Sequence, residues 1–559
     1  MDALAIYAIT AGSILLGLVF IRLLRSLTWW KDSVRVFIYR HIIYRYVVSR
    51  HRFWGPWSPI GIIEHLIYIT VNSILVLFRG TSMENVARRA GSLSLINMVL
   101  LLGAGYLSYA ADLLGVSLAR YRKMHRAAGW MTMGLAVLHV GAIGFDLKSS
   151  STQLSTRGIF TIIAVASLGA LTLMSLPFVR NISYEFFLRS HQGLTIVAVY
   201  GLWRHIPKRE LLPWLYLIIG ISAFAATSGL FFAGLLYRNG IFSGNGCPRA
   251  ILSRHGHESI ETSTTPFKVR LLLPRPINVK AGQYINLWLP AVSFWSWTQT
   301  HPFTVISWSQ EKQSVLELLV QPRKGLTGTI GRQLRTIGSE GYSSMALYSG
   351  PHGLSERVDD YQYVLLVSSD SGLSAVLPYA RKLIQGYKTC TLRVRRVHLV
   401  WQVENRGRSL KSVEEEQNPT NEVEIAVMAQ EHINDLLKED IPNDGYVRKS
   451  LHKPKESNLT SEQILSVSIY VGKNPSLLEK LSFGNHERAC FYEGAPDYED
   501  IVISELSEKN PTQEPSLQID RGEMLLLTSA SGDIRDRLQE IVRRHLDQRL
   551  NLINLEYQP

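Results

Sequence analysis

The chain has 559 residues, of which 46% are hydrophobic, and it carries a formal net charge of +13. This length exceeds that of one ordinary domain, so we expect several structural units. The three cysteines, Cys247, Cys390 and Cys490, lie too far apart in the sequence for a disulfide framework or a thiolate metal site.

Apolar segments dominate the chain up to about Arg238, and charged residues with short alternating segments dominate after it. Most of the apolar segments approach the roughly 20 residues that cross a bilayer. The predicted spans are residues 3–24, 60–78, 93–114, 127–146, 158–178, 190–206 and 213–236. The first has no basic region ahead of it, which favours a membrane anchor over a cleaved signal peptide.

The basic residues gather in two loops beside these spans. One loop follows the first span and holds Arg22, Arg25, Lys31, Arg35, Arg40, Arg45, Arg50 and Arg52. The other precedes the fourth span and holds Arg120, Arg122, Lys123 and Arg126. Such loops mark the cytoplasmic side of a membrane, although Arg79, Arg88 and Arg89 fall on the other side in this scheme. We therefore expect the half after Tyr237 in the cytosol, and no nucleic-acid partner.

Two of the apolar segments carry histidines at the same spacing. "MHRAAGWMTMGLAVLHVGAIGF" holds His125 and His139, and "SHQGLTIVAVYGLWRH" holds His191 and His205, fourteen residues apart in each case. Fourteen residues are close to four helical turns, so both imidazoles face one side of their helix, about 21 Å apart along its axis. Because ionisable groups are costly inside a membrane, the repeated spacing indicates a function.

Both of these spans run from the cytosol outward, so the first histidines lie at one level and the second histidines at another. We predict an inner pair, His125 with His191, and an outer pair, His139 with His205, each able to hold a haem between two imidazoles. Zinc is the alternative, but neither a carboxylate nor a cysteine joins either level. His65, beside Glu64, is interpreted as a hydrogen-bonding group between helices.

Short β-rich segments separated by Gly and Pro fill residues 253–351, a pattern typical of a small barrel. "HPFTVIS" begins at His301, and "LELLVQPRKGLTGTIGRQL" predicts a strand, a turn and a helix. Gly325 permits close backbone approach, and Thr327 could cap the helix, whose free amides favour a diphosphate. Arg323 and Lys324 could add positive charge, and an ordinary capped helix remains the alternative.

The remaining sequence predicts a nucleotide-binding α/β domain. "YVLLVSSDSGLSAVLPYARKLIQG" indicates a buried strand, a turn and an amphipathic helix, and "CTLRVRRVHLVWQVEN" the next parallel strand. The turn keeps only Gly372 for a phosphate, and Asp370 would repel one if it pointed inward. Arg395 and Arg396 could meet a 2′-phosphate, or could form a solvated strand end.

The predicted architecture is thus an α-helical transmembrane bundle followed by a cytosolic β-barrel and a Rossmann-like domain. The predicted units are an anchor with its basic loop at 1–58, a six-helix domain at 59–240, a barrel at 245–355 and an α/β domain at 360–559, with insertions near 403–422 and 440–463.

The histidine pairs, "HPFTVIS", "GPHG" at residues 350–353 and "VLLVSSDSGLSAVLPYARKL" together resemble the fungal ferric-chelate reductases, relatives of the NADPH oxidases. The resemblance implies a path from cytosolic NADPH through FAD and two b-type haems to an external Fe(III) or Cu(II) chelate. It also implies a multi-pass protein of the plasma membrane, with an iron permease or oxidase as neighbours.

The resemblance also implies roles for motif residues. His301, Pro302, Phe303 and Thr304 should lie against the flavin, with the Thr304 hydroxyl within hydrogen-bond reach of it. Gly325 and Thr327 should form the flavin diphosphate turn. The nicotinamide nucleotide should be bordered by Gly350, Pro351 and Gly353, with Gly372 in its phosphate turn.

The sequence departs from this family's pattern at two places. Ser369-Asp370 replaces a glycine-containing pair, and "TSASGD" at residues 528–533 lacks the cysteine of the oxidase branch. Three alternatives therefore stay open: a superoxide-generating oxidase, a membrane redox enzyme that acts on an organic acceptor, and a homologue that binds haem but no longer accepts hydride.

Overall fold

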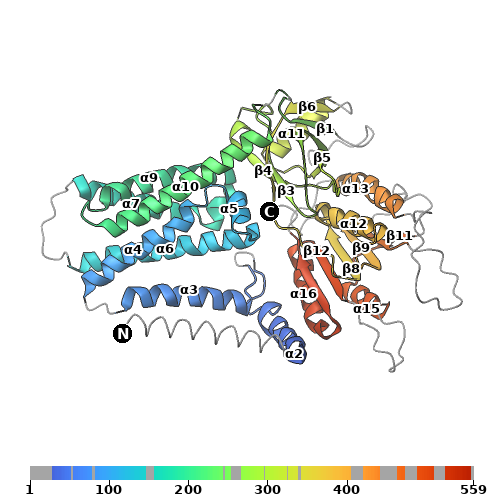
Figure 1. The fold of residues 1–559 in the computed structure, drawn as a ribbon, viewed down its shortest axis with the longest axis horizontal. Coiled ribbons are helices and arrows are strands. Elements are labelled where there is room, and N and C mark those ends of the chain that lie inside the picture. The colour runs from blue at the N-terminus through green and yellow to red at the C-terminus, as the bar shows by residue number, and fades with distance from the viewer. Residues whose placement is uncertain are drawn as a thin grey trace, which may run out of the picture.

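A computed structural model of the chain shows a helical bundle at one end and two domains containing β-sheets at the other (Figure 1). The structure describes residues 28–51, 55–78, 82–146, 156–242, 244, 246–253, 266–294, 296–323, 325–337, 341–403, 420–440, 463–471, 488–508 and 523–555. The predicted span 3–24, Lys324 and most of both predicted insertions lie outside these ranges.

The bundle forms because long apolar runs follow residues that can cap a helix. Ser58, Ser82 and Ser183 accept hydrogen bonds from the first turns of α3, α4 and α9. The helices are α2 Thr28–Ile38, η1 Tyr39–Ile43 (a π-helical turn), α3 Pro59–Leu77, α4 Met83–Leu102, α5 Leu107–Leu113, α6 Leu118–Asp146, α7 Thr156–Met174, α8 Pro177–Ile182, α9 Tyr184–His205 and α10 Leu211–Arg238.

The helix boundaries correct several predicted spans. The predicted span 93–114 is two helices, since α4 and α5 meet at 99° across the break that begins at Gly103. Helices α6 and α9 begin before the predicted spans 127–146 and 190–206, because their first turns carry polar residues that hydropathy alone excludes.

Among the described residues, α3 and α10 are long and apolar enough to cross a membrane by length and composition, and the bent α4–α5 pair would raise the number to three. Many large apolar side chains on α3 are exposed, including Leu66, Ile67 and Leu77. Exposure of such an apolar surface is unfavourable in water and favourable in lipid, so the bundle has the character of a membrane domain.

Two antiparallel sheets curl around one core to form the barrel domain, residues 246–353. One sheet has the strand order β5-β2-β1-β6 and the other β4-β3-β7. Leu252, Leu271, Ile285 and Leu316 contribute to the shared core. The elements are β1 Arg249–Ser253, β2 Phe267–Ile277, β3 Tyr284–Trp288, η2 Ser296–Thr298, β4 Thr300–Thr304, β5 Gln313–Val320, α11 Leu326–Ile337, β6 Tyr342–Met345 and β7 Leu347–His352.

The C-terminal domain is built on a parallel sheet with the order β11-β10-β9-β8-β12-β13. Its elements are β8 Tyr363–Ser369, η3 Asp370–Gly372, α12 Leu373–Lys388, β9 Arg396–Val403, α13 Thr420–Glu439, β10 Leu465–Val471, β11 Ala489–Glu493, α15 Tyr498–Glu508, β12 Met524–Ser529, α16 Gly532–Arg544, η4 Leu546–Gln548 and β13 Leu550–Asn554. The predicted strand–turn–helix–strand unit is confirmed, although β9 begins at Arg396 and not at Cys390.

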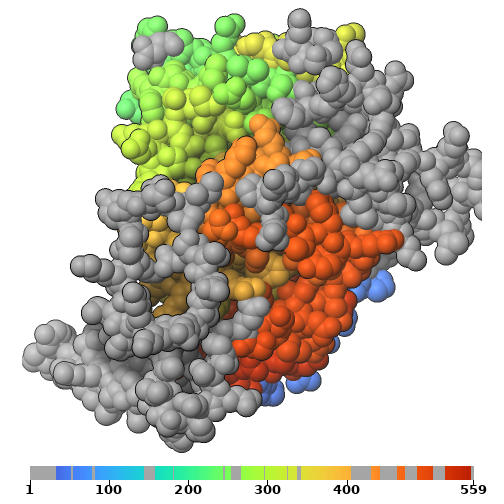
Figure 2. All heavy atoms as spheres, turned by 90° about the vertical axis from the view of Figure 1, so that its right-hand side faces the viewer, coloured from blue at the N-terminus to red at the C-terminus, as the bar shows by residue number. Residues whose placement is uncertain are grey.

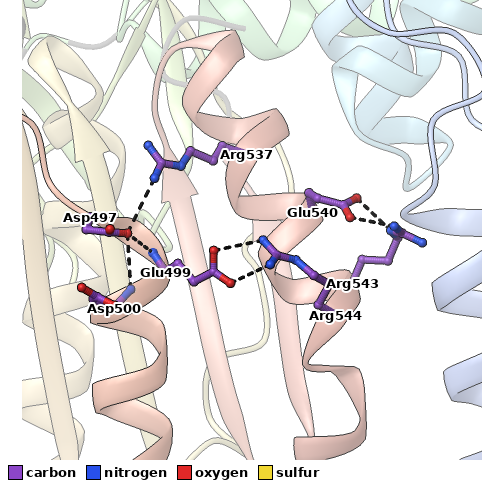
Figure 3. A network of polar contacts seen from close by, with 7 residues as sticks. All are labelled: Asp497, Glu499, Asp500, Arg537, Glu540, Arg543 and Arg544. Carbon is purple, nitrogen blue, oxygen red and sulfur yellow. Dashed lines mark hydrogen bonds and ion pairs between the residues drawn. The ribbon is translucent and has the colours of Figure 1, made fainter.

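Helices cover both faces of this sheet, which explains why strand β8 is a continuous apolar run. Leu366 packs with α12 and α13 on one face, and Leu365 packs with α15 and α16 on the other. On the outer surface, Glu499 of α15 forms an ion pair with Arg544 of α16, and Asp497 forms one with Arg537 (Figure 3). The Glu499–Arg544 pair therefore joins α15 and α16 by charge as well as by packing, and Arg543 pairs with Glu540 within α16.

A segment from the start of the chain packs onto this last domain. We call residues 35–51 the strap, and Figures 1 and 2 show the N-terminal residues in blue beside the red C-terminal elements. The Tyr44 hydroxyl lies 3.3 Å from both the amide and the carbonyl of Leu552 on β13, which forms one edge of the sheet. Arg40 pairs with Asp547 at 2.8 Å, and Arg50 with Asp536 at 2.8 Å. The strap therefore covers the backbone of an edge strand.

Candidate functional site

The four intramembrane histidines meet in two pairs. The ring centroids of His125 and His191 lie 6.4 Å apart, and those of His139 and His205 lie 6.3 Å apart. Both histidines of each helix lie within one unbroken helix, α6 or α9. The structure thus brings together the residues that the fourteen-residue spacing matched, at two levels of the bundle.

The outer pair is oriented by neighbouring groups. Nδ1 of His139 lies 2.7 Å from the Ala87 carbonyl oxygen, to which it donates, and Nδ1 of His205 lies 2.8 Å from the Thr161 hydroxyl. Such partners fix the ring orientation and direct Nε2 of His139 away from the carbonyl, as is common for histidines that bind metals.

The donor set of each pair fits a haem better than zinc. Two imidazoles bound on opposite sides of one metal ion, each about 2 Å from it, would place their ring centroids about 6 Å apart, close to the observed separations. The buried Nδ1 atoms of His125 and His191 have no hydrogen-bond partner among the described residues. Nor does any group of three or more His, Cys, Asp or Glu side chains occur there, as a zinc site would require.

His65 does not take part in either pair. Its Nδ1 lies 2.7 Å from the carbonyl oxygen of Gly61, one turn earlier in the same helix, and its ring packs at 5.1 Å against Trp57. The predicted hydrogen-bonding role is confirmed, but the bond is made within α3 and not between helices.

Strand β4 carries the HPFT motif. Because successive side chains of a strand point to opposite faces of the sheet, the four residues of the motif lie on two different faces. His301 and Phe303 pair with Leu287 and Ile285, whose side chains lie in the barrel core, so they share that face. The Phe303 side chain is itself in the core, which leaves only its backbone for a ligand. Burial lowers the pKa of His301, and its Nε2 has no partner among the described residues.

Pro302 and Thr304 face the opposite side of β4. Thr304 pairs with Tyr284, which packs in a cluster with Ala110 and Leu118 of the bundle and with Tyr121 of α6. Because Thr304 and Tyr284 lie opposite each other in the ladder, this face of the motif is directed toward the start of α6, where His125 lies.

A second contact joins the motif to the inner pair. Arg189 of α9, two residues before His191, donates to the carbonyl oxygen of Thr298, three residues before His301. The Phe187 ring, one turn before His191 on α9, lies 5.5 Å from the His191 ring. The segment just before the strand predicted to hold a flavin therefore contacts α9 two residues from the inner histidine.

The turn after β5 is open at Gly325. Gly325 has a φ of +90°, which disfavours other residues, and a side chain there would meet nothing within 4 Å. Thr327 does not cap the helix, contrary to the prediction. It is the second residue of α11, and its hydroxyl accepts a hydrogen bond of 2.9 Å from the Arg323 amide, so it closes the turn.

The GPHG segment lies where the domains meet. The Arg238 side chain donates to the Gly350 carbonyl, and the Gln283 side chain donates to the Gly353 carbonyl at 3.0 Å. The neighbouring Gly282 packs against Tyr379 of α12. A role of Gly350, Pro351 and Gly353 at the nicotinamide stays a prediction, but their surroundings include the bundle as well as the C-terminal domain.

The order of the parallel strands reverses between β8 and β12, and nucleotides bind at the carboxyl ends of strands at such a point. Ser369 ends β8, and its hydroxyl accepts a hydrogen bond of 2.9 Å from the Ser531 amide beyond β12. Gly372 lies in the same place, where a side chain would come within 2.0 Å of the Ser529 carbonyl oxygen. The Ser371 hydroxyl reaches Gln321 of the barrel at 3.0 Å, so this turn adjoins the Gly325 turn.

Arg396 does not reach the carboxyl ends of β8 and β12, contrary to the 2′-phosphate interpretation. It pairs with Tyr363 at the start of β8, so it lies at the opposite edge of the sheet, as does the preceding Arg395. Its guanidinium forms an ion pair of 3.0 Å with Glu505, which also lies 2.8 Å from His398. Burial favours a raised pKa for Glu505, but the bonds from His398 and Arg396 outweigh it and lower that pKa.

Replacing Glu505 with glutamine is expected to destabilise the C-terminal domain by about 2 kcal/mol at neutral pH, because a charged hydrogen-bond acceptor is lost. The pKa of Glu505 is lower in the folded chain than in the unfolded chain. Its contribution to wild-type stability is therefore fully present above the unfolded pKa and is lost as the pH falls through the folded pKa. Thermal unfolding of the full chain between pH 7 and pH 3 should show the gap between wild type and E505Q closing at the acidic end. A gap independent of pH would contradict this assignment.

The contacts between the bundle and the barrel were not predicted from sequence. Asp112 of α5 accepts hydrogen bonds from His352 and Gly353, and Asn239, just after α10, bonds to both backbone groups of Tyr348. The available signal was Asp112 itself, a carboxylate in the apolar stretch "LLGAGYLSYAADLLGV", where a charge needs a partner.

Comparison with known proteins agrees with this geometry. The family described as ferric reductase like transmembrane component matches residues 90–202, and the family described as FAD-binding domain matches residues 263–356. Ferric reductase transmembrane component 3 of Saccharomyces cerevisiae is 28% identical over 307 residues, which are 53% of this chain and 40% of that protein.

Two further Saccharomyces cerevisiae proteins are similar to the chain. Ferric/cupric reductase transmembrane component 2 is 28% identical over 53% of this chain and 40% of its own length. Ferric reductase transmembrane component 4 is 24% identical over 85% of this chain and 65% of its own length. The chain thus spans 40% of the length of the first two relatives. The predicted resemblance and fold class are confirmed: the chain is similar to fungal ferric reductases, with a helical region that matches their transmembrane component, a FAD-binding domain and a Rossmann-like domain.

Proposed function

We propose that the protein is a transmembrane metalloreductase that passes electrons from NADPH through FAD and two b-type haems to an Fe(III) or Cu(II) chelate. The observation that carries this proposal is the stacking of two histidine pairs in the bundle, with the barrel in contact with α6 and α9 close in sequence to the inner pair. A relative named ferric/cupric reductase supports both metals as substrates.

His125 and His191 would hold the inner haem, and His139 and His205 the outer haem. When bound, haem supplies an iron centre that takes up and releases one electron at a time. The Ala87 carbonyl and the Thr161 hydroxyl hold the outer rings in place, so these two ligands need little reorientation. Packing of α6 on α4, and of α9 on α7, holds the two ligand helices apart so that their histidines face each other.

The chain's own residues would divide the remaining tasks by location. The Pro302–Thr304 face of β4 would receive the flavin ring, with the Thr304 hydroxyl as its hydrogen-bond partner, and the open turn at Gly325 would receive the diphosphate. The turn at Gly372, where the strand order reverses, would receive NADPH. The Ser371–Gln321 bond keeps these two sites adjacent, as transfer of a hydride between them requires.

We further propose that the barrel and the C-terminal domain lie in the cytosol and that the protein spans the plasma membrane several times. Arg40 and Arg50 of the strap contact the C-terminal domain, and Arg120, Arg122 and Arg126 lie at the end of α6 that faces the barrel. Two basic segments far apart in sequence thus share one end of the bundle, which supports the topology expected from positively charged inner loops.

The test is a reduced-minus-oxidised visible spectrum of the purified full chain on addition of NADPH, followed by a ferric chelate. We expect low-spin b-type bands that appear with NADPH and fade with the chelate. Bands that appear only with dithionite would contradict the NADPH route. Bands that fade with oxygen but not with the chelate would favour an oxidase instead.

Thr304→Val should weaken FAD retention by about 5-fold, because one hydrogen bond of about 1 kcal/mol is lost without a change in side-chain shape. The measurement is the flavin content per chain after gel filtration. Thr300→Val makes the same chemical change at an exposed position on β4 and should retain FAD. Equal flavin content in wild type and T304V would remove Thr304 from the site.

A further inference from the structure

One carboxylate of the bundle holds two groups of the barrel. Oδ2 of Asp112 lies 2.6 Å from Nδ1 of His352, and Oδ1 accepts a hydrogen bond of 2.9 Å from the Gly353 amide. Nε2 of His352 in turn lies 3.0 Å from the Ser349 hydroxyl, and the His352 side chain is only 3% exposed. Every polar atom of this histidine ring is therefore engaged, and its position is set from the bundle side.

We call Asp112 with its two partners, His352 and Gly353, the clamp, and further contacts surround it. Asn239 donates to the Tyr348 carbonyl at 2.8 Å and accepts from the Tyr348 amide at 2.9 Å, while Tyr284 of β3 packs among Ala110, Ala111 and Leu118. Strand β7 is thus attached to the bundle through α5 and through the end of α10. Strand β3 lies between β7 and β4, so fixing β7 also fixes the HPFT strand, about 10 Å away across two strand spacings.

The clamp and the inner histidine belong to adjacent helices. Helix α5 ends at Leu113, α6 begins at Leu118, and His125 lies in the second turn of α6. A displacement of His352 from Asp112 would therefore change the distance between β4 and the inner histidine pair directly. The Arg189–Thr298 contact, the Asn239–Tyr348 bonds and the packing of Tyr284 would remain, but none of them holds His352 or Gly353.

We propose that Asp112 is a positioning residue that, through His352 and Gly353, keeps the barrel seated on the bundle with the HPFT strand facing the inner histidine pair. Its effect on electron transfer rests on the proposed function, but its effect on the seating of the barrel does not. The GPHG segment is then a mechanical junction between the bundle and the flavin domain.

The experiment compares the full chain in lipid nanodiscs with its Asp112→Asn variant, which keeps the size of the side chain but offers one acceptor oxygen for two donors, His352 Nδ1 and the Gly353 amide. Hydrogen exchange should show the Gly353 amide losing about 10-fold of its protection. Haem reduction by NADPH should slow by about 10-fold to 100-fold, because small displacements have large effects on transfer, while electron delivery from NADPH to a soluble dye through the flavin stays unchanged.

Glu84→Gln is the matched control, since Glu84 forms an exposed pair with Arg88 on α4 and should leave every readout unchanged. Unchanged exchange and unchanged haem reduction in D112N would overturn the proposal. So would an equal loss of dye reduction and haem reduction, since that indicates a general defect of the barrel. If the wild type shows no haem reduction by NADPH, the proposed function fails, and exchange at Gly353 still decides the seating role.

Discussion

We expect that replacing His125 with alanine would remove the proposed inner haem and stop electron flow across the membrane, while NADPH would continue to reduce the flavin. The ring centroids of His125 and His191 lie 6.4 Å apart, and among the described residues no further ligand group supports them. Loss of a direct ligand should exceed the roughly 10-fold to 100-fold effect of losing an outer partner. We expect bound haem to fall by about half or more, and chelate reduction by at least about 100-fold.

The measurement combines haem content per chain with NADPH-dependent reduction of a ferric chelate and of a dye that accepts electrons from the flavin. His65→Ala is the matched control, because His65 also lies in an apolar helix but bonds only to the Gly61 carbonyl and the Trp57 ring in the described contacts. It should retain both haems and full activity. Full haem content in both H125A and H191A would show that the ligand assignment is wrong.

Gly372→Ala is expected to abolish reduction by NADPH while dithionite still reduces the proposed haems. A Cβ atom at this position would lie 2.0 Å from the Ser529 carbonyl oxygen, which is backbone at the end of the neighbouring strand β12. Strand β12 or the turn must therefore move, at a cost of about 3 kcal/mol, the upper end of the usual range for overpacking. The movement occurs where the strand order reverses, so it also distorts the proposed nucleotide crevice.

The checks are thermal unfolding of the full chain and the rate of flavin reduction by NADPH. Ser374→Ala is the matched control two residues along, because the buried Ser374 hydroxyl has no partner among the described residues. Its removal should change stability by less than about 1 kcal/mol. Normal NADPH-dependent reduction in G372A would argue against a nucleotide at this turn.

Sequence predicted the histidine pairs well because helix geometry is rigid. A spacing of fourteen residues fixes the direction and height of both rings, and co-directional helices then leave one way to match them. The bend between α4 and α5 was missed because hydropathy is continuous through Gly103 and carries no information on direction. The start of α6 was missed for the opposite reason, since Arg120 and Arg122 interrupt the apolar run without ending the helix.

Other differences come from tertiary contacts that leave no local pattern. Thr327 stands where a cap is common, yet it bonds backward to Arg323 because Gly325 already makes the turn. Arg396 has the right charge for a phosphate but lies at the amino end of its strand, beside Glu505. Residue type suggested both roles, and strand direction and neighbouring elements decided against them.

The strap has a consequence for the biosynthesis of the protein. Tyr44 and its partner Leu552 are 508 positions apart, so the strap emerges from the ribosome long before the strand it covers. During that interval the bundle and the barrel can be completed, but the strap must stay unpaired near the membrane. A contact between such distant positions forms slowly, because forming it closes a very long loop and the entropy cost of that closure comes before the contact can stabilise it. Formation of the Tyr44–Leu552 contact would mark a chain whose last sheet is complete. In chains that end before β13, the strap and the edge of the sheet that it covers would both stay exposed to the quality-control machinery of the cell.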